Sequence, residues 1–448
     1  MDGNARSRLS PRGLVRAAHL RKLRGPVIEA PLRDVSIGEM CVIRRGTGLR
    51  QIAGHAQVVG FSEEGAVLAL LGPAQGLSRA VVIEPTGAPL KIKVSTDLLG
   101  TVVDAAGAFC ARLVVDQTND ADRPDRRDGS FDDGRRLREI DATAIIEKYP
   151  VVEPFETGVR AIDGVLGAGI GQRVAVLASA GVGKTSLLHM IAAAASADVV
   201  VIGLVGERGR EVSETIERIR EAPRADRFVV LRATSDAPAV ERAAAAASAM
   251  TIAEYFRDLG LHVVLILDSL TRYARALREI ALSAGELPAR QGYPASVFER
   301  LPRLLERAGR AGGGAITAFF SVLADDDDAF DPIAHEVISI LDGHIVLSRQ
   351  LAAEGCFPAI DILRSVSRVT ARVWDAADMQ RANAVRRVLA RAAELAMLVD
   401  MGEYRAGAVP QDDHVLAAAR RLREVLAQSQ HESSSMTETR RAIDEALA

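Results

Sequence analysis

The stretch that most constrains the fold is "VAVLASAGVGKTSLLHMIA", which runs from Val174 to Ala192. It begins with an apolar run typical of a buried strand, continues through a loop of small residues, and ends with residues that favour a helix. A strand, a loop and a helix with Gly-Lys-Thr at the junction form the pattern of a phosphate-binding loop. Such units belong to sheets of parallel strands, so the sequence predicts an α/β core.

The candidate nucleotide-binding residues are Ala178, Ser179, Ala180, Gly181, Val182, Gly183, Lys184, Thr185 and Ser186. Gly181 and Gly183 let the backbone turn so that its N–H groups point at phosphate oxygens. We expect Lys184 to reach the β- and γ-phosphates of ATP, and the Thr185 hydroxyl to hold Mg²⁺. Ala178 stands where the usual motif has glycine, and alanine is tolerated there if its φ is negative. We therefore predict a working ATP site.

Further apolar runs predict the rest of this core. "VVVIGLVG", "RFVVLRA", "HVVLILD", "AITAFFSVL" and "HIVLS" lack polar alternation, as parallel strands buried on both faces do. Helix-type segments separate them, which predicts a RecA-like P-loop NTPase domain over residues 151–370. Apolar residues at helical spacing then predict a helical C-terminal domain over residues 371–448.

Two acidic residues follow strands of this predicted sheet. Asp268 ends "LHVVLILD", and a carboxylate at the carboxyl edge of such a strand can orient the water ligands of Mg²⁺ beside the loop. Glu207 and Arg208 follow "GLVG", and Glu207 is our candidate for the base that orients the attacking water. The alternative is a surface glutamate paired with a nearby arginine. Arg208 is a further catalytic candidate, and Glu211 could support it.

The N-terminal half has a different texture. Short apolar runs split by glycine over residues 26–113 predict a small β-barrel. Residues 1–25 carry seven Arg or Lys and one acid, so they are either a solvated tail or a basic amphipathic arm for a partner or an anionic lipid surface. Residues 114–150 are dense in both charges and are expected to form a linker.

Several classes of protein are disfavoured by what the chain lacks. The formal net charge of −3 argues against a surface built for nucleic acid. The three cysteines lie far apart and suggest a reducing compartment, and the histidines show no metal-ligand spacing. We find no run of about 18 apolar residues and no secretory signal, so we expect neither a membrane span nor export.

Together these stretches resemble the type III secretion ATPases of injectisomes and flagellar export, which are related to F-type ATP synthase catalytic subunits. The resemblance runs from about residue 26 to the C-terminus. It is carried by "PFETGVRAIDGVLGAGIGQRVAVLASAGVGKTSLL", "VIGLVGERGREV", "LILDSLTRYARALREIALSAGELPARQGYPASVFERLPRLLERAG", "ILDGHIVLSRQLA" and "FPAIDILRSVSRV".

The resemblance implies a homohexamer that hydrolyses ATP to ADP and phosphate at each subunit seam. By matching motifs it makes Lys184 and Thr185 the phosphate-loop contacts, Glu207 the catalytic glutamate and Asp268 the Mg²⁺-side aspartate. It also places Phe357, in "FPAID", where an aromatic residue packs on adenine, and Arg368, in "SVSRV", as the arginine finger of the neighbouring site.

The resemblance further implies a peripheral position at the cytoplasmic face of the bacterial inner membrane. The implied partners are a stator protein, a central stalk protein, the export gate and chaperone–substrate complexes. Residues 283–294 match the segment near the central channel, or else form an ordinary surface loop. The run Asp325–Asp328 exceeds the family pattern, and nothing in the sequence explains it.

We weigh two other functions against an injectisome ATPase that energises chaperone release, unfolding and export. A proton-coupled rotary synthase subunit shares the fold and the site, but "SLTRYARALREI" favours secretion. A hexameric nucleic-acid motor needs stacking aromatics in its barrel, whereas aromatic residues make up only 4% of this chain. "IDILRSVSRV" favours the injectisome over the flagellum.

Overall fold

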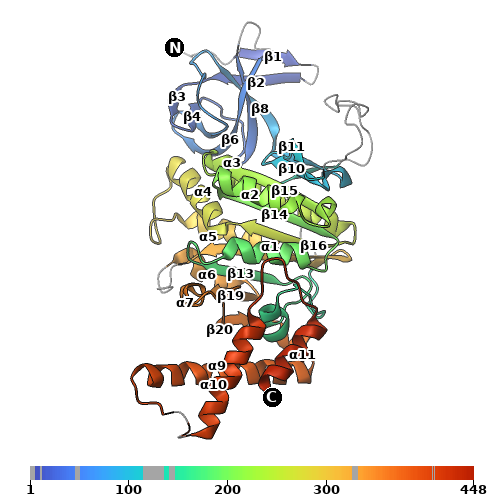
Figure 1. Cartoon of the computed structure of the whole chain (residues 1–448). Coiled ribbons are helices and arrows are strands. Elements are labelled where there is room, and N and C mark those ends of the chain that lie inside the picture. Colours follow the sequence, from blue (N-terminus) through green and yellow to red (C-terminus); the bar gives the residue numbers. More distant parts are fainter. Residues whose placement is uncertain are drawn as a thin grey trace.

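A computed structural model describes residues 6–10, 13–45, 51–114, 136–140, 147–324, 331–405, 407 and 409–448. Three parts follow one another along the long axis of the molecule (Figure 1). A β-rich N-terminal domain lies at one end, an α/β domain in the middle, and a group of helices at the other end. The expected order of β-rich, α/β and helical parts is confirmed.

The N-terminal domain is an antiparallel sheet of eight strands in the order β1-β2-β8-β5-β6-β7-β4-β3. The strands are β1 (Arg6–Ser10), β2 (Gly13–His19), β3 (Lys22–Arg24), β4 (Val27–Ala30), β5 (Glu39–Arg45), β6 (Gln51–Ser62), β7 (Gly65–Leu71) and β8 (Val82–Pro89). Ile28, Ile43 and Leu68 are fully buried within it. This small core holds the domain together by hydrophobic burial.

Residues 13–24 correct our interpretation of the N-terminus as a tail or a helical arm. Strand β2 pairs with β8, and β3 pairs with β4, so this segment belongs to the sheet. Ala18 and Leu20 are buried in the core of the domain. Backbone pairing and apolar burial therefore outweigh the basic composition on which the other two interpretations rested.

The central sheet has ten strands, with the main path β11-β10-β15-β14-β16-β18-β13-β19-β20 and with β17 paired to β18. The strands are β10 (Thr101–Asp104), β11 (Phe109–Arg112), β13 (Arg173–Ala178), β14 (Val199–Glu207), β15 (Phe228–Thr234), β16 (His262–Asp268), β17 (Gly309–Ala311), β18 (Gly314–Leu323), β19 (Gly343–Leu347) and β20 (Ile360–Ser367). From β10 to β19 every neighbouring pair on this path is parallel. The expected parallel core is confirmed.

Strands β10 and β11 belong to the central sheet, which corrects our assignment of all residues 26–113 to the barrel. Strand β10 pairs in parallel with β15, so the central sheet extends into this region. Val102 and Val103 are each 1% exposed there, on opposite faces of the sheet. Burial on both faces explains why an apparently barrel-like strand joins the α/β domain instead.

Helices cover both faces of this sheet (Figure 1). They are α1 (Lys184–Ala194), α2 (Gly209–Arg220), α3 (Ala239–Asp258), α4 (Leu270–Ser283), α5 (Ala295–Leu305), α6 (Pro332–Ile340), α7 (Arg349–Ala353) and α8 (Thr370–Val373). Alternate residues of β13 face different cores: Val174 and Val176 pack with α1, whereas Ala175 and Leu177 pack with α3 and α4. The phosphate loop therefore leaves a strand that is held from both sides.

The C-terminal helices are α9 (Ala376–Asp400), α10 (Pro410–Leu426) and α11 (Met436–Leu447). They pack on the α/β domain through a π-helix, η3 (Ile162–Leu166). The fit there is close, because a Cβ on Gly164 would lie 2.4 Å from Cδ1 of Ile443. Within the described residues, the helices are all too short or too polar to cross a membrane.

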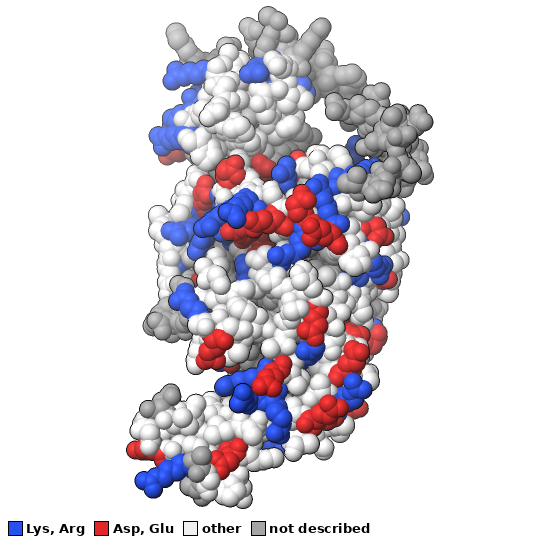
Figure 2. Space-filling model, viewed as in Figure 1, with Lys and Arg blue, Asp and Glu red and all other residues white. Residues whose placement is uncertain are grey.

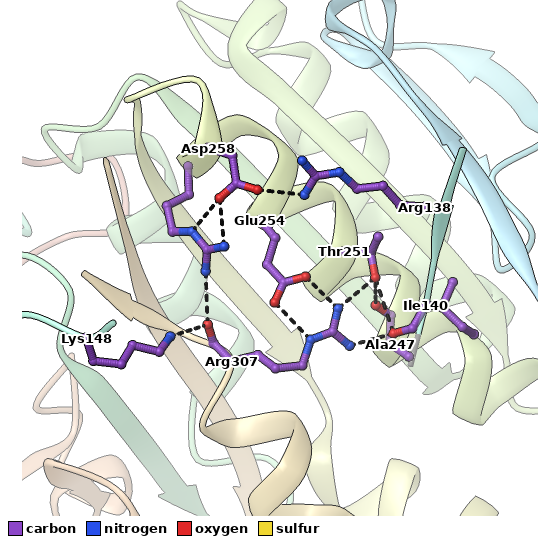
Figure 3. Close-up of polar contacts among 9 residues, drawn as sticks. Arg138, Ile140, Lys148, Ala247, Thr251, Glu254, Asp258 and Arg307 are labelled. Atoms are coloured by element: carbon purple, nitrogen blue, oxygen red, sulfur yellow. Dashed lines mark hydrogen bonds and ion pairs between the residues drawn. The ribbon is translucent and has the colours of Figure 1, made fainter. Parts of the chain in front are cut away.

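Most of the expected linker, including residues 115–135 and 141–146, lies outside the described residues. Its described pieces are β12 (Arg136–Glu139), paired with β9 (Lys91–Val94), and the chain from residue 147. Arg138 pairs with Asp258 of α3 at 2.8 Å, and Lys148 donates to the Arg307 carbonyl at 2.8 Å. Arg307 in turn pairs with Glu254 of α3 at 2.7 Å, which joins these pieces to the α/β domain (Figure 3).

Candidate active site

The phosphate loop lies between β13 and α1. Gly181 has φ 83° and Gly183 has φ 91°, a left-handed conformation that favours glycine. Ala178 is the last residue of β13 and is 2% exposed. Among the described residues only Gln291 is a non-glycine with positive φ, so Ala178 meets the condition under which alanine replaces the usual glycine. The loop therefore has an ordinary backbone despite its unusual first residue.

Lys184, at the first turn of α1, forms a buried polar cluster with the strands beside it. Its Nζ lies 2.6 Å from Oδ1 of Asp268, at the end of β16. The Ser321 hydroxyl of β18 donates to the same carboxylate oxygen at 2.6 Å, and Lys184 Nζ lies 3.3 Å from the Ser321 hydroxyl. The side chains of Lys184 and Asp268 are only 12% and 7% exposed. These strands thus hold both charges of the predicted site together.

Glu207 ends β14 next to this cluster and is 7% exposed. Arg272 of α4 pairs with it, with Nε 3.0 Å from Oε1. The pKa of Glu207 is raised to about 7, chiefly by burial and then by the nearby Asp268 charge, while Lys184 and Arg272 oppose the rise. A carboxylate that titrates near neutral pH is suited to accept a proton from water.

The loop carries donors that fit a nucleotide with its magnesium ion. The first turn of α1 presents backbone N–H groups and the positive end of the helix dipole, and Thr185 is exposed there. Ser186 is half-buried, whereas Ala180 is exposed and Val182 is buried. Within the described part of the chain, we find no group of three or more His, Cys, Asp or Glu that could hold a metal. A magnesium ion would be held by one hydroxyl and by Asp268, with nucleotide oxygens completing its shell.

A second segment, residues 348–359, reaches the loop from its other side. Arg349 opens α7, and its Nε donates to the Ser179 hydroxyl at 2.8 Å. The ring of Phe357 lies against Gly183: a Cβ placed there would be 3.5 Å from Phe357 Cε1. Phe357 is 45% exposed, so one face of its ring is open to a ligand beside the loop.

Two of the predicted residues lie away from this cluster. The Arg208 side chain is 76% exposed and lies 3.6 Å from Glu211 at the start of α2. Arg368 is exposed, follows β20, and donates to the Ile338 carbonyl at 3.3 Å. Neither side chain takes part in the contacts that join Lys184, Asp268 and Glu207.

Sequence reasoning missed three residues of the site. Arg272 lies four residues after Asp268, so its place at the start of the next helix was a usable signal. Ser321 is a polar residue within an apolar strand, which is also a signal, because a buried hydroxyl needs a partner. Arg349 carried no local signal, since its partner Ser179 lies 170 residues earlier.

A phosphate loop on a parallel sheet, next to a buried lysine and two strand-end carboxylates, defines a P-loop ATPase. Residues 158–367 match the nucleotide-binding domain of the ATP synthase alpha/beta family. Residues 374–445 match the T3SS EscN ATPase C-terminal domain. The match thus extends beyond the catalytic core to the helices at the end of the molecule.

Relatives of known identity agree. The SPI-1 type 3 secretion system ATPase of Salmonella typhi is 47% identical over 430 residues, covering 96% of this chain and 97% of the relative. The flagellum-specific ATP synthase of Pseudomonas aeruginosa is 39% identical over 436 residues, covering 96% and 92%. The assembled ATPase EscN of enteropathogenic E. coli superposes with a TM-score of 0.86 at 37% identity, covering 96% of this chain and all of EscN.

This chain belongs to the type III secretion system ATPases. The expected family, fold and ATP-hydrolysing activity are confirmed. The roles of the individual site residues stay predictions, which the geometry above now makes specific.

Proposed function

We propose that this chain is the ATPase of an injectisome, and that it hydrolyses ATP at the seams of a homohexamer to drive chaperone release, unfolding and export. The observation that carries the proposal is the division of charged groups between two edges of one sheet. Lys184, Asp268 and Glu207 lie at the carboxyl edge of the parallel strands. Arg368 lies at the opposite, amino edge.

Strand register supports this division. Ser367 pairs with Gly343, and Gly343 pairs with Val174 at the start of β13. The phosphate loop begins after Ala178, four residues further along, which is about 13 Å at the rise of a β-strand. Arg368 is therefore turned away from the loop of its own chain, and a neighbouring subunit is where its guanidinium can complete a site.

Within the site, each residue has a role that its position allows. The magnesium ion supplies charge neutralisation at the phosphates when ATP is bound. Lys184 is placed to bind the phosphates, and Thr185 and Asp268 to hold the ion. Glu207 is placed to orient and deprotonate water, and Phe357 to stack on adenine. Arg208, exposed beside Glu207, stays a candidate for contacts that form only on assembly.

Partners of the chain follow from its relatives and its surface. EscN also matches in a structure with its central stalk EscO, with a TM-score of 0.82. We infer a similar stalk contact at residues 283–294, where Leu287 is 83% exposed. Lys and Arg alternate with Asp and Glu over the face shown in Figure 2, which suits protein partners better than a polyanion.

The stronger similarity to the Salmonella typhi ATPase, at 47% against 39% for the flagellar relative, favours an injectisome. We accordingly propose a peripheral position at the cytoplasmic face of the inner membrane. A stator protein, the export gate and chaperone–substrate complexes complete the partners that we propose.

The division of the site between subunits is tested by mixing two inactive variants. Arg368→Ala is expected to reduce turnover about 10³-fold or more while nucleotide binding persists, because the guanidinium acts on the transition state. Lys184→Ala is expected to be inactive but to keep its Arg368. In an equal mixture, about one seam in four pairs an intact loop with an intact Arg368. Phosphate release from the mixture should then far exceed that of either variant alone.

Arg372→Ala, at the end of α8, is the matched control for loss of a nearby surface charge. It is expected to keep its activity alone. Failure of the mixture to recover activity, with assembly of both variants verified by light scattering, would show that Arg368 does not act across a seam.

A further inference from the structure

We propose that Arg349 is a positioning residue that fixes the base-binding segment against the phosphate loop, and so sets the affinity for nucleotide. The inference rests on the proposed function of this site, in which the loop binds phosphates and Phe357 packs on the base. Arg349 lies within "ILDGHIVLSRQLA", one of the stretches that carry the family resemblance, but the sequence alone gives Arg349 no role in the site. Its Nε donates to the Ser179 hydroxyl, which belongs to the loop itself.

The contact at Ser179 is well placed to hold the loop. Ser179 is 4% exposed and directly follows the last residue of β13, so its position is set by the central sheet. The guanidinium Nε of Arg349 donates to its hydroxyl at 2.8 Å, a normal length for a hydrogen bond from a charged donor. This part-buried bond joins the exposed Arg349, at the start of the segment at residues 348–359, to the loop.

The same segment is closed on itself and reaches the other end of the loop. The Ser348 side chain caps α7 by accepting from Leu351 N at 3.3 Å, and Ser348 N donates to the Ala359 carbonyl at 2.8 Å. Phe357 lies between these ends with its ring beside Gly183, where an added Cβ would be 3.5 Å from Phe357 Cε1. The segment thus meets the loop at Ser179 through Arg349 and at Gly183 through Phe357.

A third contact ties the segment to the C-terminal helices. The Phe357 carbonyl accepts from the backbone N of Gln428 at 2.7 Å, just after α10. Gln428 is 4% exposed and also donates through its side chain to the Gly158 carbonyl at 2.7 Å. Among these three contacts, the hydrogen bond from Arg349 to Ser179 is the polar contact that joins the segment directly to the phosphate loop.

The base and the phosphates of one nucleotide are consequently bound by two separate parts of the chain. The loop keeps its place without Arg349, because β13 and α1 hold it. Without the Arg349 bond, Phe357 is still held by β19, β20 and the Gln428 contact, but its ring is fixed less closely beside Gly183. Binding of a whole nucleotide should then weaken, whereas binding of a phosphate group alone should change little.

The experiment measures binding of fluorescent mant-ADP by anisotropy to the full chain and to three variants: Arg349→Gln, Ser179→Ala, and both together. Each single change should raise the Kd by about 5- to 10-fold, the effect of losing one hydrogen bond to a charged group. The double variant should be no weaker than the weaker single variant, because both remove the same contact. Displacement of mant-ADP from Arg349→Gln by pyrophosphate should give an inhibition constant within about twofold of the unchanged chain.

In steady-state turnover of Arg349→Gln, the KM for ATP should rise in the same proportion, with kcat reduced less than about twofold. Gln350→Ala is the matched control, since Gln350 lies beside Arg349 in α7 but donates to Glu354 rather than to the loop. It should bind mant-ADP normally. Ser179→Ala removes a single oxygen, so it tests the proposal even if Arg349→Gln fails to fold.

The proposal is overturned if the two single effects multiply in the double variant, or if pyrophosphate and mant-ADP weaken equally, which would indicate general damage to the loop. Unchanged mant-ADP binding in Arg349→Gln and Ser179→Ala would also overturn it. Failure of the unchanged chain to bind mant-ADP would instead contradict the proposed function. Lys184→Ala provides the reference for a disabled phosphate loop.

Discussion

The two edges of the central sheet differ in how they hold their charged side chains. At the carboxyl edge, Lys184, Asp268 and Glu207 are almost buried, and each has a close charged partner. At the amino edge, Arg368 is exposed, and its guanidinium donates a long hydrogen bond of 3.3 Å to the Ile338 carbonyl.

This difference shows which parts of the site a single chain can finish. Buried charges must be paired where they are, because an isolated charge in the interior is costly. An exposed arginine keeps its hydration and has no such cost, so it does not need a charged partner within its own chain. The charged groups at the carboxyl edge are therefore paired within one chain, while Arg368 at the amino edge is available for the neighbouring subunit that we propose.

The largest expected effect comes from breaking the pair at the carboxyl edge. Lys184→Ala removes the predicted phosphate contact and should lower kcat by at least as much as Arg368→Ala, about 10³-fold or more. It also leaves the buried Asp268 with only Ser321, which should lower the free energy of unfolding by up to about 3 kcal/mol. Phosphate release and urea unfolding measure the two effects. An unchanged unfolding midpoint would show that the buried pair does not stabilise the fold.

A smaller effect is expected from pH. With a pKa of about 7, Glu207 loses its charge as the pH falls, and at pH 6 about one carboxyl in ten is ionised. If the ionised form accepts the proton from water, kcat should fall about tenfold for each pH unit below 7. The measurement is kcat at saturating ATP between pH 5.5 and 9.

Arg272 allows the sign of this effect to be checked. Arg272 lowers the pKa of Glu207, so Arg272→Gln should move the acidic limb of the profile to higher pH. Arg208→Gln is the matched control, since its side chain is 76% exposed and should leave the limb in place. This electrostatic account would be contradicted if the acidic limb moved to lower pH in Arg272→Gln. It would also be contradicted if the limb moved in Arg208→Gln but not in Arg272→Gln.

The smallest expected effect is the change in stability when Arg368, at the amino edge, is replaced. Arg368→Ala should change the free energy of unfolding by less than about 0.5 kcal/mol, because an exposed side chain with one long bond adds little to stability. Urea unfolding of this variant beside Lys184→Ala measures the contrast between the edges. Destabilisation of similar size in both variants would contradict the difference between the buried charges of the carboxyl edge and the exposed Arg368 of the amino edge.

The sequence was most informative where function is local. The strand–loop–helix pattern around Lys184 and the apolar strands ending in Glu207 and Asp268 predicted the carboxyl edge, because parallel strands bring their ends together. It was least informative at domain borders. Residues 13–24 and β10 joined sheets through partners distant in sequence, and basic or glycine-rich composition gave no sign of those partners.

By itself, the sequence determined the class of fold and the family, and it predicted the residues that would bind phosphate, since these depend on short motifs and strand periodicity. Only the tertiary structure decided that Lys184 pairs with Asp268, that Arg272 holds Glu207, and that Arg349 meets the loop at Ser179. Such contacts join residues that are 65 to 170 positions apart. Their geometry depends on how whole strands and helices pack, which no local pattern in the sequence records.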